Sequence, residues 1–226
     1  RGEIQRMEQN LAQRGNLALA DNAQLKTSTK NHPSQTAAPP MAAATLPGDF
    51  VIWLLVLLEM TTFAILFMGF AGAKLAQPEV FAAGQAKLAL WSGAINTVLL
   101  VSASACAAWA LHAVRTQRNR QGSHWLLGAL ALGIGFLVVK SIEYWQKWQL
   151  GLDFANNTFD MLYVMLTGFH FLHALVGCVL FALVWAPTRS GKYTPDNCST
   201  LETVTVFWHM VDLLWMILFP LVYVLR

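Results

Sequence analysis

Five ionisable side chains lie inside apolar stretches of the sequence, at spacings that could support proton transfer or hydrogen bonding between helices. They are Glu59, His170, His173, His209 and Asp212. The two histidines His170 and His173 are three residues apart, as are His209 and Asp212, so each pair lies on one side of a helix. An ionisable residue inside a membrane span is costly and usually faces other helices or serves a function. These residues are therefore candidates for lipid contact, proton relay or helix pairing.

A second group of candidates is Lys140, Glu143 and Lys147, which lie on roughly one face of a helix. One interpretation is that the long lysine side chains reach the membrane surface and that one lysine forms an ion pair with Glu143. The other interpretation is contact with a partner protein or a lipid. Trp208 and Trp215 lie in the last apolar stretch. They are further candidates for pairing between helices.

The composition is that of a membrane protein. Of 226 residues, 56% are hydrophobic and only 12% are charged, whereas a soluble domain carries about 25% charged residues. The net charge of +3 is too small to indicate nucleic-acid binding, and no basic run is interleaved with aromatic residues as single-strand binding requires. The three cysteines form no CxxC motif, which argues against a disulfide framework or a zinc site.

Five apolar runs are each long enough to cross a bilayer as a helix. They cover residues 50–73, 88–112, 124–146, 159–186 and 201–225. The sequence thus predicts an all-α, polytopic membrane protein with a five-helix domain over residues 48–226. Residues 1–47 are polar and end in a proline-containing stretch. Such a segment buries too little apolar area to order itself, so we expect a flexible tail.

The loops predict an orientation, because cytoplasmic loops of membrane proteins carry an excess of Lys and Arg. The tail, the loop between spans two and three, and the loop between spans four and five hold most of these cations. The residues in those loops are Arg115, Arg118, Arg120, Arg189 and Lys192. We therefore expect the N-terminus in the cytoplasm and the C-terminus outside.

Depth along the predicted spans suggests one polar cluster. At 1.5 Å per residue, Glu59 lies about 14 Å, His173 about 20 Å and His209 about 12 Å from the cytoplasmic ends of their spans. Three helices could therefore bring these side chains within one or two turns of each other. Our hypothesis is a buried cluster in the inner half of the bundle, whose mutual hydrogen bonds lower the cost of burial. The alternative is that these residues only pair helices.

The sequence indicates no reaction centre of its own. It has no HExxH, P-loop or GxSxG motif and no adjacent Cys–His pair. A b-type haem needs two imidazoles on facing helices, and His173 with His209 could supply at most one such pair. We therefore expect no catalytic residues and no bound metal or haem.

Four features resemble subunit III of the haem-copper oxidases, in the order and spacing of that family. Thr167-Gly-Phe-His-Phe-Leu-His-Ala-Leu-Val-Gly177 is similar to its TGFHxxHxxxG segment, and Phe207-Trp-His-Met-Val-Asp-Leu-Leu-Trp215 to its WHxVDxxW segment. Glu59 lies at the position of a carboxylate in an early helix of that family, and Glu143 with Tyr144 matches the family's Glu-Tyr pair. The resemblance covers residues 48–226. Five spans fit the short form of the family, which lacks the first two of seven.

Finer features resemble the NorE-type accessory protein of nitric oxide reductase. They are Asp49, Gly84-Gln85, Ala94-Ile-Asn-Thr97 and Phe219-Pro-Leu221. The resemblance implies a non-catalytic subunit in a bacterial inner membrane, which packs beside a haem-copper catalytic subunit. It also implies that the subunit binds phospholipid in a cleft and supports the assembly, the proton supply and the stability of the catalytic subunit. Haem and metal would be bound only by that partner.

Three hypotheses follow from these observations. The first is an accessory subunit of nitric oxide reductase. The second is subunit III of an oxygen-reducing cytochrome c or quinol oxidase. The third comes from another class, a stand-alone b-type cytochrome or small transporter, and it predicts a haem absorption band or substrate flux from the isolated protein.

Overall fold

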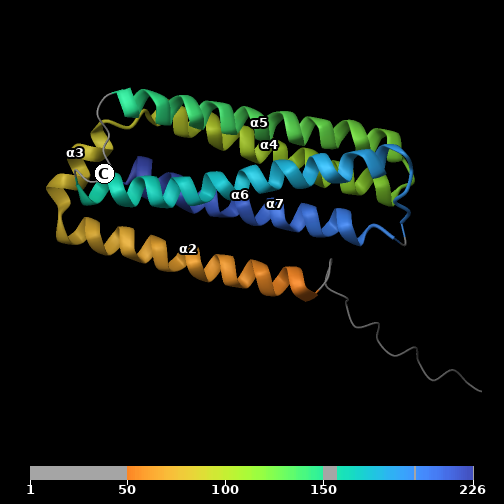
Figure 1. Ribbon diagram of the computed structural model, residues 1–226, viewed down its shortest axis with the longest axis horizontal. Coiled ribbons are helices and arrows are strands. Elements are labelled where there is room, and N and C mark those ends of the chain that lie inside the picture. Colours follow the sequence, from red (N-terminus) through yellow and green to blue (C-terminus); the bar gives the residue numbers. More distant parts are fainter. Residues whose placement is uncertain (1–49, 150–156, 196, 226) are drawn as a thin grey trace, which may run out of the picture. The chain divides into compact units, whose positions relative to one another are not determined.

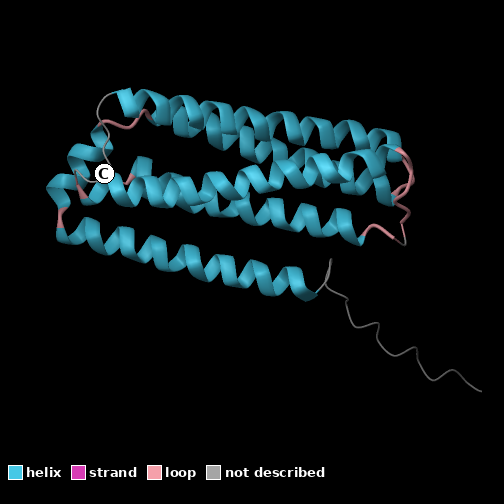
Figure 2. Ribbon diagram, viewed as in Figure 1, coloured by secondary structure: helices cyan, strands magenta, loops and turns pink. Residues whose placement is uncertain are grey.

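The computed structural model describes residues 50–149, 157–195 and 197–225. In these ranges the chain forms six α-helices and a short π-helix, and Figure 2 shows helices and loops but no strand in them. The elements are α2 Phe50–Ala76, α3 Pro78–Ala86, α4 Leu90–Arg115, α5 Asn119–Gln149, α6 Thr158–Arg189, α7 Ser199–Phe219 and η1 Pro220–Val224. The predicted all-α class is confirmed.

Five helices, α2, α4, α5, α6 and α7, are long and apolar enough to cross a membrane. The predicted spans are thereby confirmed, and the chain is a multi-pass membrane protein. Helix α5 is longer than predicted and begins at Asn119. Helix α3 was not predicted, and Pro78 and Glu79 in its first turn suit a helix start. The predicted polar tail, residues 1–47, and Asp49 lie outside the described residues.

Helix α7 lies at the centre of the packing. The most extensive contacts join α4 to α5 and α5 to α6, and α7 contacts both α4 and α6. Helix α2 lies along the edge of this group, against α6 and α7 (Figure 1). Of the five spans, α7 buries the largest share of its length and α2 the smallest. The apolar outer face of α2 is therefore left for lipid or for a partner.

The two described connections that carry arginines lie at the end of the bundle where α2 begins. The beginning of α2, the α4–α5 turn and the α6–α7 connection lie at the same end in Figure 1. Arg115 Nη2 lies 2.9 Å from Glu202 Oε1 of α7, and Asn119 Nδ2 donates to the carbonyl oxygen of Tyr193 at 2.9 Å. We call this the arginine end. The predicted orientation, with this end in the cytoplasm, stays a prediction.

The chain changes geometry where α7 reaches Pro220. Proline has no backbone N–H and cannot continue the hydrogen-bond pattern of an α-helix. The chain widens into the π-helical turn η1, and the amide of Leu225 donates to the carbonyl oxygen of Pro220 at 2.9 Å. This turn directs the side chain of Tyr223 into the bundle, where it is almost completely buried.

Candidate functional site

Glu59 of α2 and His173 of α6 form a direct carboxyl–imidazole contact, with 3.1 Å between Glu59 Oε2 and His173 Nε2. The other ring nitrogen, Nδ1, lies 2.8 Å from the carbonyl oxygen of Phe169. A carbonyl oxygen only accepts hydrogen bonds, so Nδ1 carries a proton. A second proton then lies between Nε2 and Oε2, because without it the lone pair of Nε2 would face the negatively charged carboxylate and the two would repel. The pair therefore shares one proton, as a neutral pair or an ion pair.

Aromatic rings surround this pair. Phe63 follows Glu59 by four residues on α2, and its ring centroid lies 5.4 Å from that of His173. Phe169 and Phe207 bring their rings to 4.8 and 6.4 Å from the same imidazole. The side chains of Glu59 and His173 keep exposures of 24% and 13%. The shared proton therefore lies in a low-dielectric environment that strengthens its electrostatic interactions, while the pair is still reached from the bundle surface.

His170 does not join this pair although it is one turn away on α6. Its side chain is fully buried, and both ring nitrogens lack a hydrogen-bond partner among the described residues. Its ring packs between Phe136 and Trp215, with centroids 5.7 and 5.2 Å away. The structure therefore gives His170 a packing position between α5 and α7.

The structure also separates His209 from the predicted cluster. The ring of Phe207 stacks against His173, and at 100° per residue His209 lies about 200° further around α7. Its side chain is exposed, and its Nδ1 lies 3.3 Å from Ser104 Oγ of α4. The structure thus brings Glu59 and His173 together and places His209 apart from them, so the expectation of one cluster with all three side chains is wrong for His209. The two imidazoles also do not face each other as a haem would require.

Asp212 follows His209 on the same side of α7. Its side chain is half-buried, and its Oδ1 has no hydrogen-bond partner among the described residues. The predicted His209–Asp212 pair thus lies against α4, on the side of α7 turned away from Glu59. The similar positions of these residues along their helices had suggested one cluster. His209 and Asp212, however, lie on a different side of α7 from the ring that contacts His173, so the residues form two separate groups.

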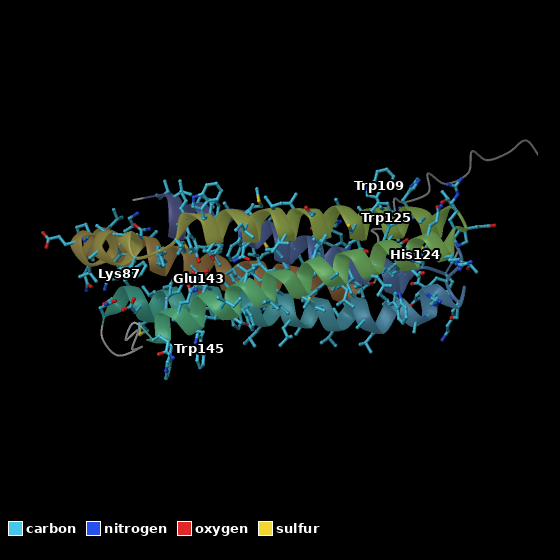
Figure 3. All side chains as sticks on the ribbon, turned by 90° about the horizontal axis from the view of Figure 1, so that it is seen from above. Lys87, Trp109, His124, Trp125, Glu143 and Trp145 are labelled. Atoms are coloured by element: carbon cyan, nitrogen blue, oxygen red, sulfur yellow. The ribbon has the colours of Figure 1, made fainter. Side chains whose placement is uncertain are left out.

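A second ionic network occupies the end opposite the arginine end. Figure 3 labels Glu143 at this end, with Lys87 and Trp145 nearby. Lys140 Nζ lies 3.2 Å from Glu143 Oε2, and Lys147 Nζ lies 3.0 Å from Oε1. The Lys140 side chain is fully buried, and that of Lys147 is 10% exposed. The interpretation that these lysines reach the membrane surface is therefore wrong, because the carboxylate holds both ammonium groups inside the bundle.

Three further residues complete this network, and sequence reasoning missed them. The hydroxyl groups of Tyr163 of α6 and Tyr223 of η1 each donate to Glu143 Oε1 at 2.7 Å. Ser92 Oγ of α4 donates to Oε2 at 2.8 Å, and Lys140 donates to both tyrosine hydroxyls. The only available signal was indirect, since two lysines and one glutamate in an apolar span need other polar partners. The network therefore joins α4, α5, α6 and η1.

The two predicted tryptophans pair helices by packing. Trp208 is fully buried, and its ring fills the space beside two glycines. A Cβ on Gly177 would lie 2.6 Å from Trp208 Cε3, and one on Gly133 would lie 2.9 Å from its Cη2. Trp215 is also buried, and its Nε1 donates to Thr97 Oγ1 of α4 at 2.9 Å. These contacts hold α7 against α4, α5 and α6.

Comparisons with known proteins agree on one family. A family model described as cytochrome c oxidase subunit III matches residues 48–226. A Synechocystis protein named cytochrome c oxidase subunit 3 is 29% identical over 177 residues, which are 78% of this chain and 75% of that protein. The protein of that name from Thermostichus vulcanus is 32% identical over 132 residues, or 58% of this chain and 64% of that protein. The matching Gallus gallus protein is 25% identical over 129 residues, which span 48% of its length.

Proposed function

The chain belongs to the cytochrome c oxidase subunit III family, and from this membership we propose that it acts as the non-catalytic subunit III of a haem-copper oxidoreductase. In this role it packs beside a haem-copper catalytic subunit in a bacterial inner membrane. The Glu59–His173 pair is the observation that carries the proposal. A pair that shares one proton suits the supply of protons to a neighbouring subunit and is of little use to a plain membrane anchor.

We further propose that phospholipid covers the edge of the bundle where α2 meets α7. A cavity of about 500 Å³ there is lined by apolar side chains of both helices and η1. A neighbouring cavity of about 680 Å³ includes Lys74 and Gln85. The apolar walls suit the acyl chains of a phospholipid, and the cation Lys74 at one end suits its head group. The thin packing of α2 supports a role for lipid in holding this helix in place.

The more specific proposal is that the catalytic partner reduces nitric oxide. Its support comes from the sequence segments similar to NorE-type accessory proteins. One of these segments, Gly84-Gln85, has two structural contacts here. Gly84 approaches Phe159 so closely that a Cβ would lie 2.2 Å from its ring, and Gln85 Nε2 donates to the carbonyl oxygen of Val222 at 2.9 Å. Both contacts fix the position of α3.

The second candidate is subunit III of an oxygen-reducing cytochrome c oxidase, which the names of the similar proteins favour. Affinity purification of the full chain in mild detergent, followed by mass spectrometry, distinguishes the two. Recovery with a nitric oxide reductase catalytic subunit supports the first, and recovery with an oxygen reductase supports the second. A chain recovered alone with a haem absorption band would overturn both.

Glu59→Gln tests the proton-sharing role. The amide keeps the size of the side chain and its hydrogen bonding, so we expect normal assembly. It cannot share a proton with His173, so turnover by the assembled complex should fall several-fold or be lost sooner during sustained turnover. The measurement is the turnover rate of the purified complex and the decline of that rate during sustained turnover. Glu79→Gln, an exposed carboxylate on α3, is the control, and wild-type kinetics for Glu59→Gln would remove the proposed role.

A further inference from the structure

A recess at the arginine end lies between the last turns of α4 and the first turns of α5. Its volume is about 470 Å³, and the residues used below that line it are Trp109, His112, Arg118, His124 and Trp125. Figure 3 labels Trp109, Trp125 and His124 close together at this end, far along the bundle from Glu143. It therefore lies apart from the Glu143 network, and Glu59 and His173 are absent from its lining.

The walls of this Trp109–Trp125 recess are aromatic. The two indole rings stack with centroids 6.3 Å apart and an interplanar angle of 27°. His112 sets its imidazole edge-on against Trp109 at 6.1 Å. The indoles nevertheless keep exposures of 57% and 44%. Half-exposed indoles at the end of a membrane span lie at head-group level, where one edge meets lipid chains and the other meets water.

The floor of the recess is shaped by the turn that ends α4. The amide of Gln117 donates to the carbonyl oxygen of Val114 at 3.0 Å, and the amide of Arg118 donates to that of Ala113 at 2.8 Å. This is the Schellman pattern, whose central residue takes a left-handed conformation usually left to glycine. Gln117 takes it here with φ of 60°. The turn leads directly into α5, whose positive N-terminal end then lies beside the recess.

The charge of the recess is positive. Arg118 lines it, no carboxylate does, and the guanidinium of Arg118 has no ion-pair partner among the described residues. Arg120 lies close by in sequence and is exposed, whereas Arg115 is paired with Glu202. A free guanidinium next to a helix N-terminus is a strong arrangement for binding a phosphate group.

We propose that the Trp109–Trp125 recess binds the head group of an anionic phospholipid in the leaflet at the arginine end. The phosphodiester accepts hydrogen bonds from Arg118, and the imidazoles of His112 and His124 supply further donors near the glycerol. The stacked indoles support the glycerol and the first carbons of the acyl chains. Basic pockets between membrane helices are typical sites for such head groups. This site goes beyond the proposed function, because it needs no catalytic partner.

Lipid titration of the purified full chain tests this proposal. Tryptophan quenching is recorded in detergent with phosphatidylglycerol that carries brominated acyl chains, and with brominated phosphatidylcholine as the neutral comparison. The wild-type chain should bind phosphatidylglycerol about tenfold more tightly, as expected for one charge-assisted contact. Arg118→Gln should abolish that preference. Arg120→Gln is the matched control, since it removes the same charge two residues further on, in the first turn of α5, where the side chain does not line the recess.

Each other outcome of this titration counts against the proposal. An equal loss of preference in Arg118→Gln and Arg120→Gln would mean that general charge attracts the lipid. A phosphatidylglycerol-specific part of the quenching that stays unchanged in Trp109→Phe with Trp125→Phe would mean that the lipid binds elsewhere; quenching of other exposed tryptophans, such as Trp91 and Trp145, is the same with both lipids and is subtracted. Displacement of the lipid by millimolar inorganic phosphate would mean that the recess binds free phosphate. Retention of lipid under that challenge, with the Arg118 effect, supports the lipid site.

Discussion

Glu143→Ala should cause a severe loss of folded protein. The carboxylate of Glu143 accepts hydrogen bonds from Ser92, Lys140, Lys147, Tyr163 and Tyr223. Without it, the fully buried ammonium group of Lys140 loses its ion-pair partner, and Lys147 keeps only its weaker interaction with Asp160. Removing one partner of a buried ion pair typically costs about 3–5 kcal/mol. The thermal unfolding midpoint of the purified chain, and its recovery as a single species in detergent, measure the loss.

Two variants control this experiment. Glu79→Ala removes an exposed carboxylate on α3, which lies at the end opposite the arginine end in Figure 1, and should change the midpoint little. The double change Lys140→Met with Glu143→Gln also removes the fully buried cation, and it should recover part of the loss because fewer charges stay unpaired. A midpoint for Glu143→Ala equal to that of the wild-type chain would show that the network does not stabilise the fold.

Trp208→Ala should cause a comparable loss for a different reason. Trp208 is fully buried at the centre of the bundle, and its ring centroid lies 4.8 Å from that of Phe181. Lipid chains are as apolar as a protein interior, so lost packing contributes most of the cost. Truncating a buried tryptophan leaves a cavity and costs about 3–5 kcal/mol. The same thermal midpoint reports this loss.

The glycines beside Trp208 provide an independent check. Gly177→Ala places a methyl group against the ring and should destabilise by about 1–3 kcal/mol through overpacking. Trp145→Ala, at a position 67% exposed on α5, is the control and should leave the midpoint nearly unchanged. If Trp208→Ala behaved like Trp145→Ala, the central position of α7 in the packing would be contradicted.

Much of the fold could be predicted because it depends on local composition. Five apolar runs give five spans, since a helix satisfies its own backbone inside a membrane. The spans begin and end within a few residues of the predicted positions, apart from α5. Helix α3 was missed because it is too short to stand out as a span, and its only signals are Pro78 and Glu79 at its start.

The sequence by itself determined the membrane class, the five spans, the family motifs and the position of each ionisable residue along its span, because the rise of a helix is the same in every context. Only the tertiary structure decided which side chains meet, because the contacts of a side chain depend on which neighbouring helix packs against its face of the helix. Glu59 therefore meets His173 while His209 meets Ser104. For the same reason, Lys140 is buried by Tyr163 and Tyr223, two residues that no local pattern had connected to it.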